Sequence, residues 1–276
     1  MISRRVFSAA ILSVLSASSL TPALAQTPAG LVPHRAVYNL ELAEASERSG
    51  ISNMFGRMVY EFTGSACEGW RVNFRFVTQL ESGGEKKTTD QQSSTFEDPK
   101  SGRFEFESRT YNEDRLEKEV NGFAERKPEG IAVDITSPEE KQVDLANARF
   151  PTQHTLDVLN IAAKGQHFYE ARIFDGSDDG DKTLVTSTVV GAPVATDTDA
   201  KDLKAIGALK DEKAWPVTIA YFEDGKMTDA LPNYRMSFKL FPNGVSRDLT
   251  MDYGDFVLKG SLVKLDMLPG EGCKSK

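Results

Sequence analysis

The sequence predicts an all-β protein in which an antiparallel meander curls around one α-helix. Apolar and polar residues alternate in many short segments, and turn signals separate these segments at short intervals. One segment, residues 151–164, has the periodicity of a helix instead. Short connections favour antiparallel neighbours, because parallel strands need long crossover connections.

Period-2 alternation marks the predicted strands. Trp70, Phe74 and Phe76 alternate with polar or charged residues, and Phe104 and Phe106 repeat the pattern. The same alternation recurs in three more segments: residues 131–135, 234–240 and 249–253. Each segment predicts a strand with one buried and one solvated face, and we expect roughly thirteen or fourteen strands in total.

Turn signals separate the predicted strands, and the number of strands predicts a curled sheet. The signals are Ser82-Gly83-Gly84, Asp98-Pro99, Asn121-Gly122, Asp175-Gly176, Asp224-Gly225 and Pro242-Asn243-Gly244. A single sheet of this size cannot stay flat, because accumulated twist makes it curl or close. Its buried face then needs cover from the sheet's own curvature, from a helix or from a ligand.

Residues 151–164 predict one amphipathic helix of three turns. Pro151 opens it and Gly165 follows it, as at many helix ends. Its apolar residues share one face: Leu156, Leu159, Ala162 and Ala163. We expect this helix to lie against or inside the curved sheet. A weaker helical pattern lies within Asp199–Leu209, whose composition fits a loop equally well.

Residues 1–25 predict a cleaved signal peptide. Arg4 and Arg5 precede an apolar stretch, and Ala23-Leu24-Ala25 fits a cleavage site. The apolar stretch is too short for a membrane span of roughly 20 residues, and an anchor helix is the weaker alternative. We therefore expect residues 26–276 to form a single periplasmic domain. Export follows the Sec route or, given the paired arginines, the twin-arginine route.

The charge of the chain argues against nucleic acid as a partner. The full chain has a formal net charge of −8, and loss of the two arginines in the signal makes that of the mature chain −10. An acidic protein repels nucleic acid and anionic lipid headgroups at long range. We therefore expect neither nucleic-acid binding nor membrane binding by charge alone.

Two cysteines, Cys67 and Cys273, predict one structural disulfide. In an oxidising compartment only one intramolecular pairing exists for them. The loop of roughly 200 residues that the bridge closes would contribute up to about 5 kcal/mol by the chain-entropy formula. A reactive thiol pair is the alternative, but the sequence has neither CxxC spacing nor a nearby histidine.

Catalytic motifs are absent from the sequence. It contains no HExxH, GxSxG, P-loop or GxGxxG motif, and its three histidines do not cluster. We therefore expect no catalytic residue, no cofactor and no enzymatic activity. Carboxylates are abundant, so a hydrolase acting on cell-wall or glycan substrates stays an alternative, although no pair stands out.

Two further patterns invite a binding site. Residues 175–181 place Asp175, Ser177 and Asp179 at EF-hand spacing, but Thr186 stands where calcium needs a glutamate, so we expect an acidic loop and no metal. The aromatic residues of two predicted strands are candidates to line a lipid cavity, with ordinary core packing as the other interpretation. They are Trp70, Phe74, Phe76, Phe104 and Phe106.

Several dispersed segments resemble one known family. They are residues 31–38 (LVPHRAVY), 150–155 (FPTQHT), 174–177 (FDGS) and 255–262 (DFVLKGSL), together with Cys67 and Cys273. In these segments the chain resembles the cell-envelope integrity protein EipB family of alphaproteobacteria, over essentially the whole mature chain. The resemblance implies a monomeric periplasmic β-spiral: an open, barrel-like curl of strands around one helix, with the two cysteines bridged.

The resemblance also implies a role and a partner. Family members support envelope integrity under stress, their fold is similar to that of periplasmic lipoprotein carriers, and a periplasmic tetratricopeptide-repeat protein is the implied partner. No catalytic residue carries over. We therefore predict a non-enzymatic periplasmic factor that maintains the envelope by binding protein or ligand. The alternatives are a carrier of a lipid or lipoprotein, and the hydrolase.

Overall fold

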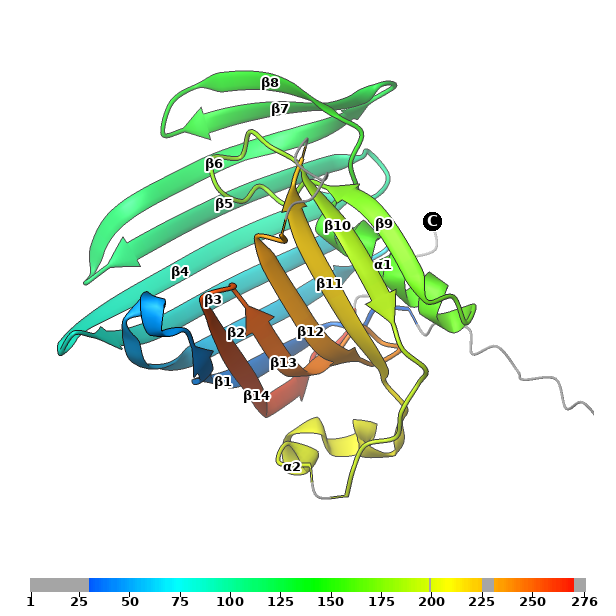
Figure 1. Ribbon diagram of the computed structural model, residues 1–276. Helices are drawn as coiled ribbons and strands as arrows, with labels where there is room; N and C mark the ends of the chain where they lie inside the picture. The colour runs from blue at the N-terminus through cyan, green and yellow to red at the C-terminus, as the bar shows by residue number, and fades with distance from the viewer. Residues whose placement is uncertain (1–29, 199, 225–230, 271–276) are drawn as a thin grey trace, which may run out of the picture.

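Fourteen antiparallel strands form a single sheet in the computed structural model, which describes residues 30–198, 200–224 and 231–270 (Figure 1). The strands follow one another as a meander, which confirms the predicted fold class and topology. The predicted signal peptide, residues 1–25, lies outside the described residues, and so does Cys273.

The chain order is eight strands, a helix, two strands, a short helical segment and four strands. The first part comprises β1 (His34–Ala45), η1 (Glu47–Ser49), β2 (Ile51–Ser65), β3 (Gly69–Ser82), β4 (Glu85–Asp98), β5 (Arg103–Asn112), β6 (Arg115–Lys127), β7 (Gly130–Ser137) and β8 (Lys141–Ala146). The second comprises α1 (Pro151–Ala163), β9 (Phe168–Ile173), β10 (Leu184–Val190), α2 (Leu203–Ile206), η2 (Gly207–Asp211), β11 (Trp215–Glu223), β12 (Tyr234–Leu240), β13 (Ser246–Asp252) and β14 (Phe256–Met267).

The sheet curls until its two edge strands approach each other. β1 lies in the middle, between β2 and β14, and the sheet ends at β8 on one side and β9 on the other. Just after β8, Arg149 forms a single parallel bridge to Ile173 of β9. Its N–H donates to the Arg172 carbonyl oxygen at 2.8 Å, and its own carbonyl oxygen accepts from Phe174 N–H at 2.9 Å. The result is an open, barrel-like curl and not a closed barrel.

Alternation along the strands explains which face is concave. In β1, Ala36, Tyr38 and Leu40 are buried, whereas the residues between them are partly or fully exposed. Successive side chains of a strand point to opposite faces, so the buried set marks the inside of the curl. This concave face forms one core with β2 and β14 and another with β5–β7, where the fully buried Phe150 and Phe174 pack.

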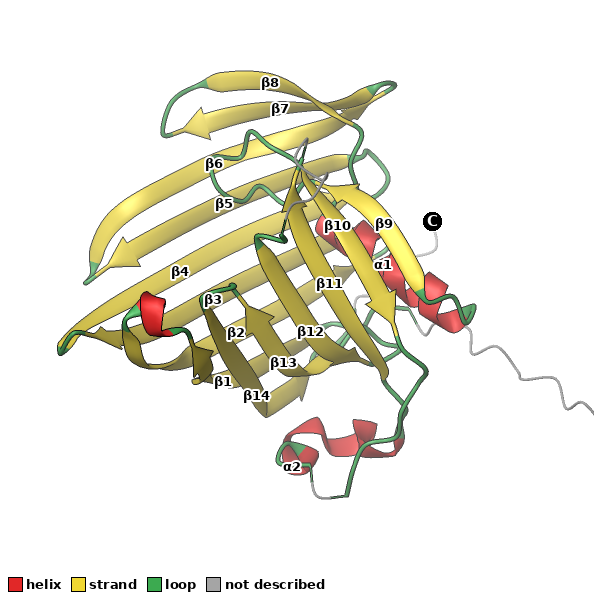
Figure 2. Ribbon diagram, viewed as in Figure 1, coloured by secondary structure: helices red, strands yellow, loops and turns green. Residues whose placement is uncertain are grey.

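The main predicted helix forms, and the weaker segment is helical in part. α1 runs from Pro151 to Ala163, which confirms the main helix, and it packs on β10–β12 through Val158 and Leu159. Figure 2 shows α1 in red between the two halves of the curled sheet. The weaker segment forms the short α2 and η2, whose Ile206 packs against the β1–β14 core. No helix in the described part of the chain is long and apolar enough to cross a membrane.

One predicted turn was wrong. Asn121-Gly122 lies inside β6, at a register shift in the pairing with β7. Gly122 faces the Phe106 ring, and a Cβ atom at this position would lie 2.7 Å from that ring. The glycine therefore permits a close approach of ring and backbone within a strand, which the sequence alone does not distinguish from a turn.

Candidate functional site

A row of side chains crosses the concave face and changes from aromatic to polar. Tyr60 of β2 pairs with Phe74 of β3, Phe74 with Ser93 of β4, and Ser93 with Ser108 of β5. Directly paired residues of neighbouring strands point to the same face. The buried neighbours of Tyr60 on its own face, such as Met58, show that this face is the concave one.

A cavity of about 600 Å³ lies over this row. Tyr60, Val72 and Phe74 form an aromatic and aliphatic wall on β2 and β3. Opposite them, β4 and β5 contribute uncharged polar side chains that we call the polar strip: Gln91, Ser93, Thr95, Ser108 and Thr110. The volume is in the range of roughly 300–1,000 Å³ that is typical of small-molecule sites.

The start of α1 and the loop after β9 complete the cavity. Pro151 reaches it from the helix, and Asp175–Asp178 reach it from the loop. Gly176 and Gly180 of this loop pack directly on the Phe106 ring, where a Cβ atom would lie 2.5 Å and 2.8 Å from ring atoms. The loop glycines therefore allow close packing over β5.

Two lysines form ion pairs with carboxylates of the acidic loop, residues 175–181. Lys118 Nζ lies 2.8 Å from Asp179 Oδ1, and Lys141 Nζ lies 2.5 Å from Asp181 Oδ2. Among the described residues, no three His, Cys, Asp or Glu side chains are placed to hold a metal ion together. Ion pairing with lysine is therefore the role that the structure gives these two carboxylates.

Glu97 of β4 anchors the N-terminus of α1 beside the cavity. Its Oε2 accepts a hydrogen bond from Thr152 N–H at 2.8 Å, and its Oε1 accepts from Gln153 N–H at 3.1 Å. These are two of the N–H groups that a helix leaves without an internal partner. Burial raises the pKa of Glu97, and its hydrogen bonds to the helix and the charge of Arg126 oppose this shift.

We expect Glu97→Ala to lower the free energy of unfolding by about 2 kcal/mol, because it leaves buried helix N–H groups without an acceptor. Denaturant titration measures this loss. The matched control is Asp98→Ala, one residue further along β4. The Asp98 carboxylate accepts an exposed hydrogen bond from Lys100 N–H. A loss no larger than that of the control would contradict the anchoring role of Glu97.

His154 of α1 is buried and neutral. Its Nε2 lies 3.3 Å from Thr186 Oγ1, and its ring stacks on Tyr169 with the centroids 5.7 Å apart. Burial lowers the pKa of His154 from 6.5 to about 4. A lowered pKa means that the unfolded chain binds the proton more readily, so the stability this group contributes above pH 6.5 is lost as the pH falls.

We expect the free energy of unfolding to fall by about 2 kcal/mol between pH 7 and pH 5 through His154 alone. Urea titrations at several pH values measure this slope in the wild type and in His154→Gln. The variant keeps a polar side chain but does not titrate, so its curve should be flatter by that amount. Parallel curves would contradict the assignment of the pH dependence to His154.

The structure divides the predicted aromatic stripe between cavity and core. Phe74 and Phe106 line the cavity. Phe106 is nevertheless only 4% exposed and belongs to the core with Phe104. The other three are also buried: Trp70 stacks on Phe62 at 4.8 Å, Phe104 stacks on Phe150 at 5.0 Å, and Phe76 packs in the β1–β14 core. Ligand contact by the stripe stays a prediction, and of the two residues that line this cavity only Phe74 is not buried.

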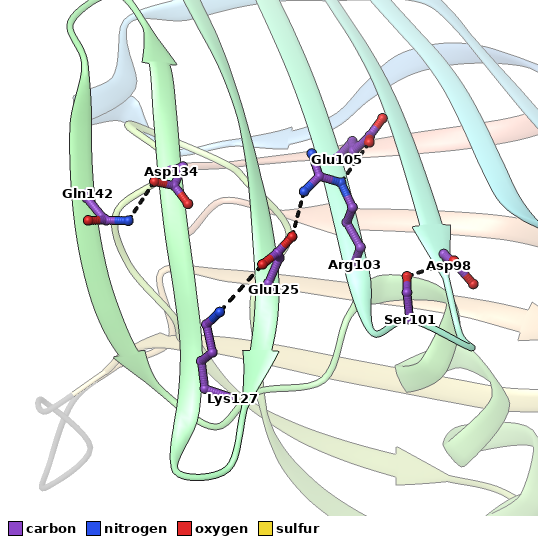
Figure 3. A network of polar contacts seen from close by, with 8 residues as sticks. All are labelled: Asp98, Ser101, Arg103, Glu105, Glu125, Lys127, Asp134 and Gln142. Atoms are coloured by element: carbon purple, nitrogen blue, oxygen red, sulfur yellow. Dashed lines mark hydrogen bonds and ion pairs between the residues drawn. The ribbon is translucent and has the colours of Figure 1, made fainter.

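Many polar side chains of the convex face are paired with one another. Figure 3 shows part of this network, in which Arg103 lies between Glu105 and Glu125 at 2.9 Å and 2.8 Å. Further across the same face, Gln142 Nε2 of β8 donates to Asp134 Oδ1 of β7 at 2.8 Å. Two depressions of about 420 and 380 Å³ lie on this face, and such pairs form part of their lining: Arg35–Glu61 in the first and Arg103–Glu105 in the second. The concave cavity is therefore the better candidate site.

Sequence reasoning missed the polar strip and Glu97. Residues 85–95 contain no large apolar side chain, so the alternation that marks the other strands is missing from β4. That absence was the available signal, because a strand inside a curled sheet ordinarily has apolar residues on its inner face. Glu97 gave no signal, since its partners in α1 lie more than 50 residues away in the sequence.

Cys67 lies in the turn between β2 and β3, where its carbonyl oxygen accepts a hydrogen bond from Lys100 Nζ at 2.6 Å. β14 ends at Met267, which pairs with His34, and His34 pairs with Phe62 near the end of β2. The chain after β14 therefore leaves the sheet at the same end as the Cys67 turn. The other cysteine of the predicted bridge lies outside the described residues, so the bridge stays a prediction.

Comparison with known proteins identifies the family. A family model described as EipB-like matches residues 25–269. The chain is 47% identical over 238 residues to the "Cell envelope integrity protein EipB" of Brucella abortus (strain 2308), which covers 86% of this chain and 84% of the relative.

A solved structure agrees with this assignment. The crystal structure of a beta-barrel-like protein of a domain of unknown function from Brucella abortus matches with a TM-score of 0.84 and 46% identity. The match covers 87% of this chain and 99% of that one. The open curl of antiparallel strands, the family model and the close relative agree, and the chain belongs to the EipB-like family.

Proposed function

We propose that the protein maintains the cell envelope as a binding protein of the periplasm and not as an enzyme. The envelope role is supported by the name of its relative in Brucella abortus. The observation that supports binding is the concave cavity of about 600 Å³ with its aromatic wall and polar strip. Within the described residues, His34 and His167 bond to backbone carbonyl oxygens, and neither forms a nucleophile–base pair there.

Complementation of a deletion strain tests this proposal. Ser93→Trp places a bulky side chain inside the cavity, whereas Ser94→Trp places the same side chain on the convex face. We expect the deletion to increase detergent sensitivity, Ser94→Trp to restore resistance and Ser93→Trp to fail, with both variants folded by circular dichroism. Full rescue by Ser93→Trp would argue against the cavity as the working site.

Location and bridge belong to the same proposal. The predicted signal peptide supports a periplasmic location for the mature chain, where cysteines oxidise. We propose that Cys67 pairs with Cys273, which follows Met267 by six residues. The end of β14 lies two strands away from the Cys67 turn, which is roughly 10 Å at the usual strand spacing. Six extended residues span about 20 Å, so the chain after Met267 is long enough to reach Cys67.

A lipid or lipoprotein carrier is the second candidate. The wall formed by Tyr60, Val72 and Phe74 offers apolar contact for an acyl chain. Native mass spectrometry of protein purified from the periplasm without detergent tests this candidate. Excess mass that matches a lipid would support a carrier, and a bare monomer would favour binding of another ligand or of a protein.

A protein partner remains part of the proposal. The tetratricopeptide-repeat partner that the sequence resemblance implies could use β8, which within the described residues pairs only with β7. An unpaired edge strand can add a strand from another chain. Loss of co-purification after a Val143→Pro substitution in β8 would support this contact, and unchanged co-purification would contradict it.

A further inference from the structure

The polar strip on the concave face lacks protein partners. Within the part of the chain that the structure describes, none of its five side chains forms a hydrogen bond to another residue. The convex face of the same two strands is different, because its polar side chains pair. Asp90 accepts hydrogen bonds from Arg75 Nη2 of β3 and from Gln92 Nε2, and Ser94 Oγ donates to Asn73 Oδ1 of β3. Arg109 Nη2 lies 2.6 Å from Glu107 Oε1.

The strip also departs from the pattern of the rest of the concave face. In the central row, Ser93 and Ser108 lie between Phe74 on one side and the fully buried Val120 on the other. Half-buried hydroxyl groups without partners stabilise the fold less than apolar side chains would at the same positions. A local departure that weakens the core is expected where a residue serves function.

The strip is uncharged, and the two basic side chains that line the cavity are already paired with carboxylates. Lys118 pairs with Asp179, and Arg109 pairs with Glu107 and Glu119. An anionic ligand would call for an arginine or lysine aimed at it. Serine and threonine hydroxyls and the glutamine amide each donate and accept hydrogen bonds, which matches a ligand that is neutral and rich in hydroxyl groups.

The facing wall supplies the second half of such a site. Phe74 stands next to Ser93 in the register, and Tyr60 stands next to Phe74. The face of an aromatic ring is negative and attracts the positive C–H edges of a sugar ring. We propose that the concave cavity binds a neutral saccharide, whose hydroxyl groups bond to the polar strip while its ring packs on Phe74 and Tyr60. This inference rests on the proposed binding function and names its ligand class.

An acyl chain fits the cavity less well than a saccharide. It would cover the polar strip without offering a single hydrogen bond, so five polar side chains would lose water and gain no partner. Loss of the hydroxyl groups should therefore weaken the binding of a saccharide but not the binding of an acyl chain. Ser93→Ala/Ser108→Ala removes two paired hydroxyls of the central row and keeps the shape of the cavity.

Saturation-transfer NMR and titration calorimetry with two neutral trisaccharides, triacetylchitotriose and maltotriose, test the proposal on the mature protein. Palmitate serves as the acyl probe. We expect at least one trisaccharide to bind, Ser93→Ala/Ser108→Ala to weaken that binding tenfold or more, and palmitate binding not to fall. Ser94→Ala, one residue away on the convex face, is the matched control and should bind as the wild type does.

Two outcomes would overturn the inference: absence of binding by both trisaccharides at millimolar concentration, or equal binding by the wild type and the double variant. Either result leaves the binding function standing if Ser93→Trp still fails to complement the deletion strain. Rescue by Ser93→Trp would instead contradict the proposed function, whether or not the trisaccharides bind. An unchanged melting temperature of the double variant shows that a loss of affinity is not a loss of folding.

Discussion

Arg247→Met is expected to lower the free energy of unfolding by about 3–5 kcal/mol, because it leaves a buried carboxylate without its counter-charge. Arg247 of β13 is only 2% exposed, and its Nε lies 2.8 Å from Oδ2 of the buried Asp202, just before α2. The two groups form a buried ion pair, and Arg247 Nη2 also lies 3.7 Å from Oδ2 of the more exposed Asp248.

Urea titration with a second substitution separates charge burial from packing. Arg247→Met/Asp202→Leu removes both charges, and we expect it to recover most of the loss, since apolar replacement of a buried pair is often neutral or stabilising. Burial raises the pKa of Asp202, opposed by the charge of Arg247, so the single variant should lose less at acidic pH, where Asp202 is protonated. Equal stability of the single and double variants would contradict this account.

The pair fastens the segment between β10 and β11 to the sheet. Arg247 Nη1 also donates to Thr196 Oγ1 at 3.2 Å, and Ile206 of α2 packs into the β1–β14 core together with Leu258. Short helical pieces like α2 have little stability of their own. Tertiary contacts of this kind therefore explain why the chain is helical from Leu203 to Asp211.

The local parts of the fold could be predicted from the sequence, and the non-local parts could not. A few neighbouring residues are enough to recognise the alternation at Phe104 and Phe106, and the proline and glycine at the ends of α1. The approach of Gly122 to Phe106 and the capping of α1 by Glu97 depend on which strands become neighbours. Such contacts join residues that are distant in the sequence, so no local pattern predicts them.

The candidate site divides in the same way. The aromatic stripe was visible as alternation, but alternation does not tell a cavity wall from a packed core. Phe74 lines the cavity and Phe76, two positions further along the same face, is buried, because Phe76 packs among residues of β1 and β14. The polar strip on β4 faces inward only because β3 and β5 fix the register of Ser93.

Cys67→Ser is expected to lower the free energy of unfolding by up to about 5 kcal/mol, because the bridge to Cys273 would close a loop of roughly 200 residues and so restrict the unfolded chain. β1 and β14 lie side by side in the middle of the sheet, so a link from the β2–β3 turn to the tail after β14 would hold this central pairing together. Denaturant titration of oxidised protein measures the loss.

The two cysteines provide a control that separates a bond from two independent side chains. If the bond exists, Cys67→Ser, Cys273→Ser and the double variant are destabilised equally, since each substitution removes the same covalent link. Dithiothreitol should then destabilise the wild type by a similar amount and leave the variants unchanged. Additive effects of the two substitutions, or alkylation of both thiols in the folded, non-reduced protein, would show that the cysteines act separately. The central pairing of β1 with β14 would in that case depend on hydrogen bonds and packing alone.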